Sequence, residues 1–492
     1  MKKFRVFLLL IIMLPCILFF GGCSEEVYVL RIEKTETIGN VDTYTIYYSN
    51  NTTSNFTIEN GTDGEDGEDL TIEAIFNALV ERGEYPDTSN ESFKAFLSDY
   101  LNITYEEDSV NKAVVNAMPS VVNIYAEQPE QVTGGSFPYF TVENESQIYC
   151  GSGVIYQMDD NYSYIITNYH VVYSSTSILD NKISRMIYAY QYGKDVVVTE
   201  TSSNDAYDAP TKQLGGEGIE CEYIGGSMNY DIAVLRVSTS ALKEINPDAK
   251  AVTVADGYSL ADTAIAIGNP EGDGISVTSG VISVESEYYT MVGADEETVI
   301  TFRGIRIDTA VNGGNSGGGL FNIKGELIGI VNSKLVYSSD GTPIDNIAHA
   351  LPYDNVVKVA DNIIDNYKKN SASGNSDPVK VTKLTLGLSA TTENSQTIYD
   401  YISGEITITE DTVVTSFSSN SLAQSRGMQV GDIITSVQIN ETEYEITRYF
   451  QLNDLMLTVR ENDQVIINIS RNHISQSIVI GEISSSMLTT VE

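Results

Sequence analysis

Three residues that lie far apart in the sequence have the chemistry needed for nucleophilic catalysis. Ser316 stands in the stretch NGGNSGGGLF, His170 follows the apolar stretch YIITNY, and Asp231 directly precedes the apolar run IAVLRV. A serine hydroxyl becomes an effective nucleophile when an imidazole accepts its proton, and a carboxylate on the other ring nitrogen fixes the imidazole tautomer. These residue types predict a serine, histidine and aspartate site if the fold brings them together.

Each of the three residues also has a simpler interpretation. A glycine and serine cluster is typical of a flexible turn, a single histidine is more often structural, and an acid at a strand edge is usually a turn residue. Glycine, however, permits positive φ and close backbone approach, so N–H groups beside Ser316 could bind an oxyanion. The chain order His170, Asp231, Ser316 is that of chymotrypsin-type barrels and differs from the orders in subtilisin and α/β-hydrolase folds.

The segment that carries these residues has the pattern of an all-β domain. Between residues 109 and 368, short β-rich runs alternate with Gly, Asn and Asp, as in a barrel. The hydrophilic stretch 369–382 predicts a linker. Residues 383–492 predict a second, smaller β-rich domain with one helical segment, RYFQLNDLML.

The N-terminus has the features of a secretory signal over residues 1–22. A basic start, MKKFR, precedes a short apolar stretch, and FGGC resembles the lipobox of bacterial lipoproteins. We expect Cys23 to carry two acyl chains and to anchor the protein to the cell membrane, facing outside the cytoplasm; an uncleaved apolar anchor is the alternative. Residues 23–69 predict a membrane-proximal β segment with an acidic linker, and residues 70–108 predict a small helical hairpin.

Cysteine count and charge limit the chemistry further. With Cys23 acylated, Cys150 and Cys221 remain after the signal is removed; export permits a disulfide between them, and two free thiols are the alternative. The formal charge of −40 argues against nucleic acid as a partner, because such a surface repels phosphate. We expect no metal and no cofactor, since the acidic run near residue 65 fails the EF-hand spacing.

The motifs of the central domain, taken together, resemble the HtrA/DegP-like serine proteases of the trypsin-like class. They are GSGVI, TNYHVV, DIAVLRV, AIGNPEG, VTSGVIS, NGGNSGGGLFNIKGELIGI and HALPYDNV, in the family's order. The resemblance implies a mainly β protein with a trypsin-like double β-barrel. It also implies that His170 is the general base, Asp231 its orienting carboxylate and Ser316 the nucleophile, with the N–H groups of Gly314 and Ser316 as oxyanion hole.

The same resemblance implies a specificity pocket and an assembly. Ala310, six residues before the nucleophile, and Asn332 are assigned to the pocket, and the absence of an acid there predicts cleavage after small or aliphatic residues. Aromatic residues in GSFPYF (Phe137, Tyr139 and Phe140) predict a homotrimer, with packing under their own loop as the alternative. We expect His349 and His473 to be structural or surface residues, and residues 173–222 to form an enlarged loop.

The C-terminal domain has its own relative. KLTLGLSA, NSLAQSRGMQVGDIITSVQIN and VIINISRN resemble a PDZ domain, which follows the protease in the HtrA family. PDZ domains add a peptide strand to a sheet edge and hold its terminal carboxylate on backbone amides. The resemblance implies a carboxylate loop of Leu386, Gly387 and Leu388 and a groove helix that begins near Tyr449; a β module without a ligand is the alternative.

These inferences combine into one function. We expect a membrane-anchored extracytoplasmic serine endopeptidase that cleaves misfolded or specific envelope proteins through an acyl-enzyme, with PDZ-assisted capture of unfolded or C-terminally exposed protein substrates. A non-proteolytic chaperone or a surface-binding lipoprotein on the same scaffold is the alternative.

Overall fold

The computed structural model describes residues 29–38, 41–48, 52–59, 72–83, six residues between 86 and 96, and 109–136, 139–204, 210–334, 346–399 and 406–492. The chain divides into two compact units, Met1–Glu107 and Asp108–Glu492, and each is described by itself. The predicted signal and Cys23 lie outside the described residues. Within these ranges, no helix is both long and apolar enough to cross a membrane.

The N-terminal unit contains a small sheet and a helix. Strands β1 (Val29–Ile38), β2 (Val41–Tyr48) and β3 (Thr53–Glu59) pair as an antiparallel meander in that order. Helix α2 (Ile72–Glu81) follows. Ile46, Phe76 and Phe96 are buried together in a small apolar core.

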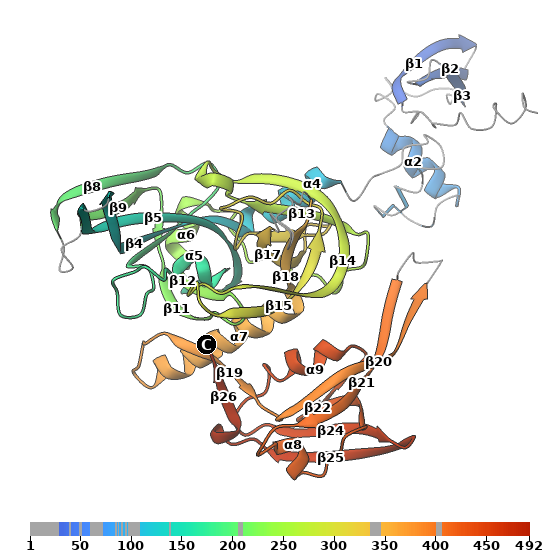
Figure 1. Cartoon of the computed structure of the whole chain (residues 1–492). Coiled ribbons are helices and arrows are strands. Elements are labelled where there is room, and N and C mark those ends of the chain that lie inside the picture. Colours follow the sequence, from blue (N-terminus) through green and yellow to red (C-terminus); the bar gives the residue numbers. More distant parts are fainter. Residues whose placement is uncertain are drawn as a thin grey trace, which may run out of the picture. The chain divides into compact units, whose positions relative to one another are not determined.

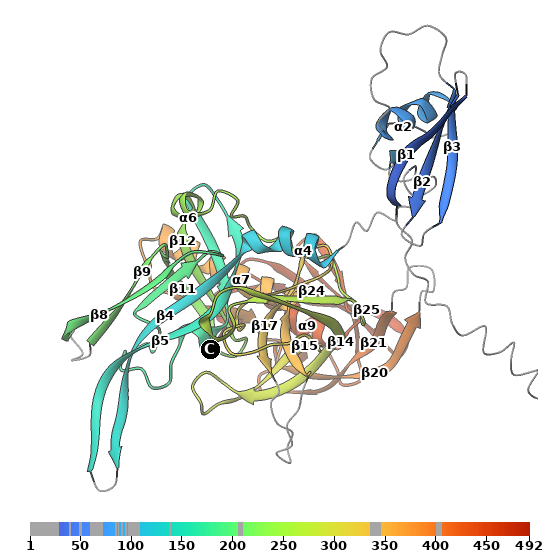
Figure 2. The same cartoon turned by 90° about the horizontal axis from the view of Figure 1, so that it is seen from above.

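The first half of the second unit is built on one large sheet. Helix α4 (Val110–Ala117) leads into it, and nine strands follow the order β10-β7-β4-β5-β6-β12-β11-β19-β26. Figure 2 shows β4 and β5 extending beyond the rest of the sheet as a long hairpin. The enlarged segment 173–222 adds a separate two-stranded hairpin, β8 with β9. The bounds are β4 Val121–Ser136, β5 Tyr139–Met158, β6 Tyr162–Thr167, β7 Met186–Tyr190, β8 Val196–Asn204, β9 Pro210–Gly216, β10 Ile219–Glu220, β11 Glu222–Ser227 and β12 Ile232–Ser238.

The second half closes into a six-stranded barrel of order β13-β14-β15-β18-β17-β16. Its interior is packed with aliphatic side chains such as Ile265, Ile305 and Leu320, all fully buried. Helix α6 (Thr239–Ile245) connects the two halves, and helix α7 (Tyr353–Ala372) follows the last barrel strand. The bounds are β13 Thr263–Gly268, β14 Ser276–Val292, β15 Val299–Ile307, β16 Gly319–Phe321, β17 Leu327–Lys334 and β18 Ala348–Pro352.

The C-terminal β domain has an antiparallel sheet around its own apolar core, an arrangement consistent with a PDZ fold. Its sheet follows the order β20-β21-β22-β24-β25, and β23 pairs with β22. The predicted helical segment RYFQLNDLML is helix α9. The bounds are β20 Leu388–Tyr399, β21 Ile406–Phe417, α8 Leu422–Ser425, β22 Ile433–Ile439, β23 Thr442–Glu445, α9 Tyr449–Leu455, β24 Gln464–Arg471 and β25 Ile474–Glu482.

The prediction of a linker at 369–382 is wrong for most of that stretch. Helix α7 continues to Ala372, and β19 (Val379–Leu384) pairs in parallel with β11 of the large sheet. Strand β26 (Leu488–Val491) then pairs with β19, so the end of the C-terminal domain also joins that sheet. The physical reason is that alternate residues of β19, Val379 and Val381, are buried on the large sheet, a period of two that the polar flanks obscure.

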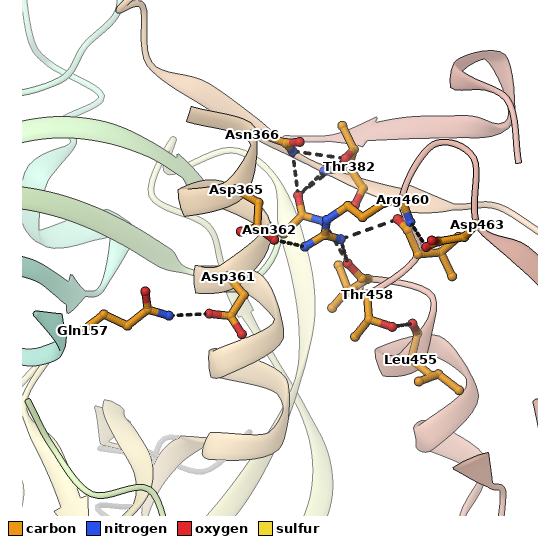
Figure 3. Close-up of polar contacts among 12 residues, drawn as sticks. Gln157, Asp361, Asn362, Asp365, Asn366, Thr382, Leu455, Thr458, Arg460 and Asp463 are labelled. Atoms are coloured by element: carbon orange, nitrogen blue, oxygen red, sulfur yellow. Dashed lines mark hydrogen bonds and ion pairs between the residues drawn. The ribbon is translucent and has the colours of Figure 1, made fainter. Parts of the chain in front are cut away.

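Polar contacts fix the C-terminal domain to α7. The fully buried Asn362 donates its amide to the carbonyls of Thr382 (2.7 Å) and Leu457 (2.8 Å), and its Oδ1 accepts from the Thr382 N–H. Figure 3 shows Asn362 together with Thr382. Arg460 pairs with Asp365 on the same helix. Figure 1 shows α7 between the barrel domain and α9. The domain is therefore docked rather than flexibly tethered.

A buried ion-pair cluster reinforces this docking. Arg303 on β15 lies 2.7 Å from both Asp354 of α7 and Asp454 of α9, and its guanidinium stacks 4.0 Å from the Phe450 ring centroid. Breaking one partner of such a buried group is strongly destabilising, because the remaining charge stays desolvated. The protease and C-terminal domains thus share one set of buried contacts.

Other predictions have mixed outcomes. Cys150 and Cys221 are free thiols, so the disulfide alternative is wrong for this structure. Burial raises the pKa of Cys221, in keeping with an unreactive structural thiol. Phe137 lies outside the described residues, as do the side chains of Tyr139 and Phe140, and the trimer stays a prediction.

Candidate active site

Strand pairing explains why His170 and Asp231 meet. Strands β6 and β12 are antiparallel neighbours, and Thr167 is paired with Ala233. His170 lies three residues past this pair in the short helix α5 (Tyr169–Val172), and Asp231 lies two residues before it. Both side chains therefore leave the sheet at the same edge.

The contact between the two residues has the geometry of an oriented base. His170 Nδ1 lies 2.7 Å from Asp231 Oδ2, and the His170 main-chain N–H donates to Asp231 Oδ1 at 3.0 Å. The Asp231 side chain is 7 % exposed, whereas the His170 side chain is 35 % exposed. The carboxylate is thus enclosed while the imidazole still faces solvent, and Nε2 is the ring nitrogen left for a substrate-side proton.

Asp231 has a strained backbone that its neighbours hold in place. Its φ is +49°, a left-handed conformation that is uncommon for residues other than glycine. Asn168 donates its amide to the Asp231 carbonyl (2.9 Å), and the Asp231 N–H donates to the Met228 carbonyl (3.1 Å). Strain of this kind persists only where the surroundings over-determine it, and it occurs often at functional sites.

Hydrogen bonds to its main-chain carbonyl groups hold the glycine-rich loop around Ser316 in place. Ser152 is fully buried; its hydroxyl donates to the Gly314 carbonyl and its N–H to the Ser316 carbonyl, both at 2.8 Å. The Glu271 N–H donates to the Gly313 carbonyl, also at 2.8 Å. Gly314 has φ +91°, and a Cβ there would lie 2.1 Å from the Asn269 carbonyl oxygen. Only glycine fits this position.

This arrangement leaves two backbone donors available. A planar trans peptide points its N–H away from its own carbonyl, so anchoring the Gly313 carbonyl sets the direction of the Gly314 N–H. Within the described part of the chain, the N–H groups of Gly314 and Ser316 have no hydrogen-bond acceptor. The loop therefore has the donors that an oxyanion requires.

The Ser316 hydroxyl itself donates to the Asn332 carbonyl at 3.1 Å, and not to the His170 ring. Hydrogen bonds of catalytic groups are often long or unmade in structures without substrate and form in the complex. The structure therefore bonds His170 to Asp231, and Asn332 contacts both Asp231 and the Ser316 hydroxyl. The catalytic roles of the three residues stay a prediction.

The two residues assigned to the specificity pocket lie in different surroundings. Ala310 is exposed, and its carbonyl accepts from the Thr278 hydroxyl at 2.7 Å. Asn332 is 2 % exposed, and its amide nitrogen donates to Asp231 Oδ2 at 2.5 Å. The Asn332 side chain thus supports the aspartate rather than forming an open pocket wall, while the role of Ala310 stays a prediction.

The two other histidines form no hydrogen bond to His170, Asp231 or Ser316 within the described residues. His349 is 5 % exposed, its Nε2 lies 2.9 Å from Glu287 Oε1, and burial lowers its pKa. His473 is exposed in the turn between β24 and β25.

The predicted carboxylate loop of the C-terminal domain borders a groove. Leu386, Gly387 and Leu388 line a cavity of about 480 Å³ between the start of β20 and helix α9. Leu452 of α9 and Met456, the residue after the helix, form an apolar wall of the groove. Tyr288 of barrel strand β14 also lines the groove. Gly387 has φ +69°. The protease domain therefore contributes one wall residue to this groove of the C-terminal domain.

Sequence reasoning missed the residues that support the triad. Ser152 and Asn168 stand in quoted motifs, GSGVI and TNYHVV, so a motif search could have singled them out. No pattern in the sequence points to Asn332 as a partner of Asp231, because the two residues are 101 positions apart and lie in different halves of the protease domain.

We expect activity to fall on acidification with a midpoint above the ordinary histidine range. Burial alone lowers the pKa of His170, but the charge of Asp231 and its hydrogen bond outweigh burial and raise it. A general base must be neutral, so activity is lost as pH falls through this raised pKa, above about 6.5. Measuring kcat/KM on a short peptide between about pH 5 and about pH 8 checks this. A flat profile would contradict His170 as the base.

Comparisons with known proteins identify a peptidase domain in this chain. The trypsin-like peptidase domain family matches residues 151–330. The serine protease Do-like HtrA of Lactococcus lactis subsp. cremoris (strain MG1363) is 27 % identical over 375 residues, which cover 74 % of this chain and 80 % of that protein. The serine endoprotease DegS of Escherichia coli (strain K12) is 30 % identical over 257 residues, 52 % of this chain and 58 % of that protein.

Among solved structures, the HtrA-type protease AlgW with decapeptide aligns with a TM-score of 0.43 and 23 % identity, over 76 % of this chain and 98 % of that chain. The peptidase-domain match covers the segment that holds His170, Asp231 and Ser316. The chain contains a trypsin-like peptidase domain and is similar to HtrA-type serine proteases, and its activity is that of a serine endopeptidase.

Proposed function

We propose that Ser316 is the nucleophile of this endopeptidase, with His170 as its general base and Asp231 as the orienting carboxylate. The observation that carries the proposal is the His170 Nδ1 to Asp231 Oδ2 contact of 2.7 Å beside the Ser316 loop. This contact keeps the proton on Nδ1, so that Nε2 can accept the serine proton.

The reaction then proceeds in two steps. Ser316 Oγ attacks the scissile carbonyl as its proton passes to His170, and the resulting oxyanion is bound by the N–H groups of Gly314 and Ser316. His170 then gives this proton to the leaving amine as the peptide C–N bond breaks. The acyl group stays on Ser316 as the acyl-enzyme. Water then attacks the ester as its proton passes to His170. His170 returns this proton to Ser316 Oγ as the ester C–O bond breaks, which releases the second product and restores the free enzyme.

We further propose that the enzyme acts outside the cytoplasm, anchored through lipid on Cys23, as a homotrimer that cleaves misfolded or specific envelope proteins. The support for the anchor is the basic and apolar N-terminus that ends in FGGC. Localisation of the mature protein by membrane extraction, with Cys23→Ser as the comparison, tests this part: the wild type is expected in the membrane fraction and the variant outside it.

Substrate capture is assigned to the groove between β20 and α9. Its apolar wall and the loop with Gly387 at φ +69° suit an apolar C-terminal residue with a free carboxylate. Because the domain is docked, capture does not act through a flexible tether. A ligand in the groove also meets Tyr288, whose ring lies 6.1 Å from that of Tyr449, so an effect on kcat is the competing outcome.

We expect substrates that end in an apolar residue with a free carboxylate to have a KM about tenfold lower than the same substrates with an amidated end, which corresponds to 1.4 kcal/mol. Leu388→Glu places a negative charge in the groove and should erase this difference. Val430→Glu is the matched control, since Val430 is 63 % exposed in the same domain and does not line the groove.

The measurement is steady-state kinetics of the two substrate forms with all three proteins. A difference in KM that only Leu388→Glu removes supports capture. A difference confined to kcat means that groove binding activates the enzyme instead. Equal kinetics for free and amidated substrates in the wild type would overturn the assignment of this groove.

A further inference from the structure

Asn332 occupies a position between two members of the proposed triad. Its amide nitrogen donates to Asp231 Oδ2 at 2.5 Å, and its main-chain oxygen accepts from the Ser316 hydroxyl at 3.1 Å. The residue is 2 % exposed, so water does not replace these partners. The orientation of this one side chain therefore affects the aspartate directly.

A side-chain amide can be placed in two ways, and only one suits Asp231. The nitrogen must face the carboxylate, because a carbonyl oxygen facing it would be repelled. The group that fixes the choice is Tyr289 on β14, whose hydroxyl donates to Asn332 Oδ1 at 2.9 Å. With this bond made, the amide nitrogen is directed toward Asp231.

The Tyr289 ring is itself held by two neighbouring rings and by a glycine. It stacks on the His349 ring with centroids 4.1 Å apart and planes 14° from parallel, and it packs 5.8 Å from the Phe302 ring. A Cβ on Gly304 of β15 would lie 2.5 Å from a ring carbon of Tyr289. Glycine at 304 thus makes room for this ring in the barrel.

We propose that Tyr289 is a positioning residue for the reaction: its hydroxyl sets the Asn332 amide, and through that amide it orients the Asp231 carboxylate and the His170 ring. The inference rests on the proposed roles of Asp231 and His170. The Tyr289 hydroxyl bonds Asn332, which in turn bonds Asp231, so we expect its effect on proton transfer and not on substrate binding.

The test begins with Tyr289→Phe, which keeps the ring and removes only the hydroxyl. We expect kcat on a short peptide to fall on the order of 10- to 100-fold, as for other small misplacements of catalytic groups, with KM unchanged. Tyr156→Phe is the matched control: Tyr156 is also partly buried and donates its hydroxyl to a side-chain oxygen, Oδ1 of Asp361 on α7, which is not one of the proposed catalytic residues. It should keep wild-type kcat.

A double-mutant cycle separates positioning from a general loss of structure. In an Asn332→Ala background the hydroxyl has no amide to orient, so adding Tyr289→Phe should change kcat no further. Selective labelling of the three histidines gives a second readout: the NMR signals of His170 should shift in Tyr289→Phe while those of exposed His473 do not.

The outcomes distinguish this inference from the proposed function. Wild-type kcat in Tyr289→Phe, or fully additive effects in the cycle, would overturn the role of Tyr289 while the wild-type enzyme still cleaves peptide. A wild-type protein that is folded but does not cleave peptide would instead overturn the proposed catalytic roles.

Discussion

Ser316→Ala is expected to lower kcat on the order of 10⁶-fold, as the loss of the nucleophile does in other serine proteases. The substitution removes Oγ, whose hydrogen bond in this structure is to the Asn332 carbonyl, and leaves the loop carbonyls anchored by Ser152 and Glu271. The fold should therefore be retained, with an unchanged thermal unfolding midpoint.

The measurement is steady-state cleavage of a short peptide and of an unfolded protein substrate. Ser240→Ala is the control, since it removes the hydroxyl of an exposed serine on α6. Cleavage by purified Ser316→Ala at more than a thousandth of the wild-type rate, a limit set far above the ~10⁶-fold loss, would contradict the assignment.

Asp231→Asn is expected to lower kcat about 10⁴-fold at neutral pH. The asparagine is nearly the same size, but its NH₂ group would donate to His170 Nδ1 and leave the ring proton on Nε2. The ring could not then accept the serine proton. Removing the carboxylate also removes the charge and hydrogen bond that raise the pKa of His170, so that pKa should fall.

Kinetics at one pH and an NMR titration of the three histidines check both parts. Asp248→Asn, at an exposed site in the same domain, is the control and should keep wild-type values. Activity of Asp231→Asn within tenfold of the wild type would show that this carboxylate does not orient the base.

The contact between His170 and Asp231 and the β-rich domains could be predicted because their signals are local. The apolar runs that end at Thr167 and begin at Ile232 are strands, and their antiparallel pairing suffices to bring His170 to Asp231. The family resemblance of the glycine-rich loop added the third residue. Periodicity also indicated α9, whose buried Leu452 and Leu455 lie on one face.

The docking of the C-terminal domain could not be predicted, because it depends on polar residues that are buried. Asparagine is a residue type usually found on the surface, yet Asn362 is fully buried and donates to the carbonyls of Thr382 and Leu457. A buried polar residue costs little once its hydrogen bonds are made, and the partners lie 20 and 95 residues away. The polar composition of residues 369–382 therefore suggested a flexible linker, whereas tertiary contacts hold the two domains together there.

The support behind Asp231 was missed for a related reason. Asn332 and Tyr289 come from β17 and β14, and their contacts exist only after the second barrel closes. Neither residue belongs to a periodic pattern or a motif in the sequence that indicates a contact with Asp231. Their roles follow from distances of 2.5 Å and 2.9 Å and could be found only in the structure.

The most direct test of the account is covalent labelling of the folded protein with a fluorophosphonate, followed by intact mass measurement and peptide mapping. Such a reagent reacts with a serine hydroxyl only when a neighbouring base activates it. The account predicts one adduct, on Ser316, that is absent in Ser316→Ala and strongly slowed in Asp231→Asn. No adduct on a folded wild-type protein, or an adduct on a different serine, would contradict it.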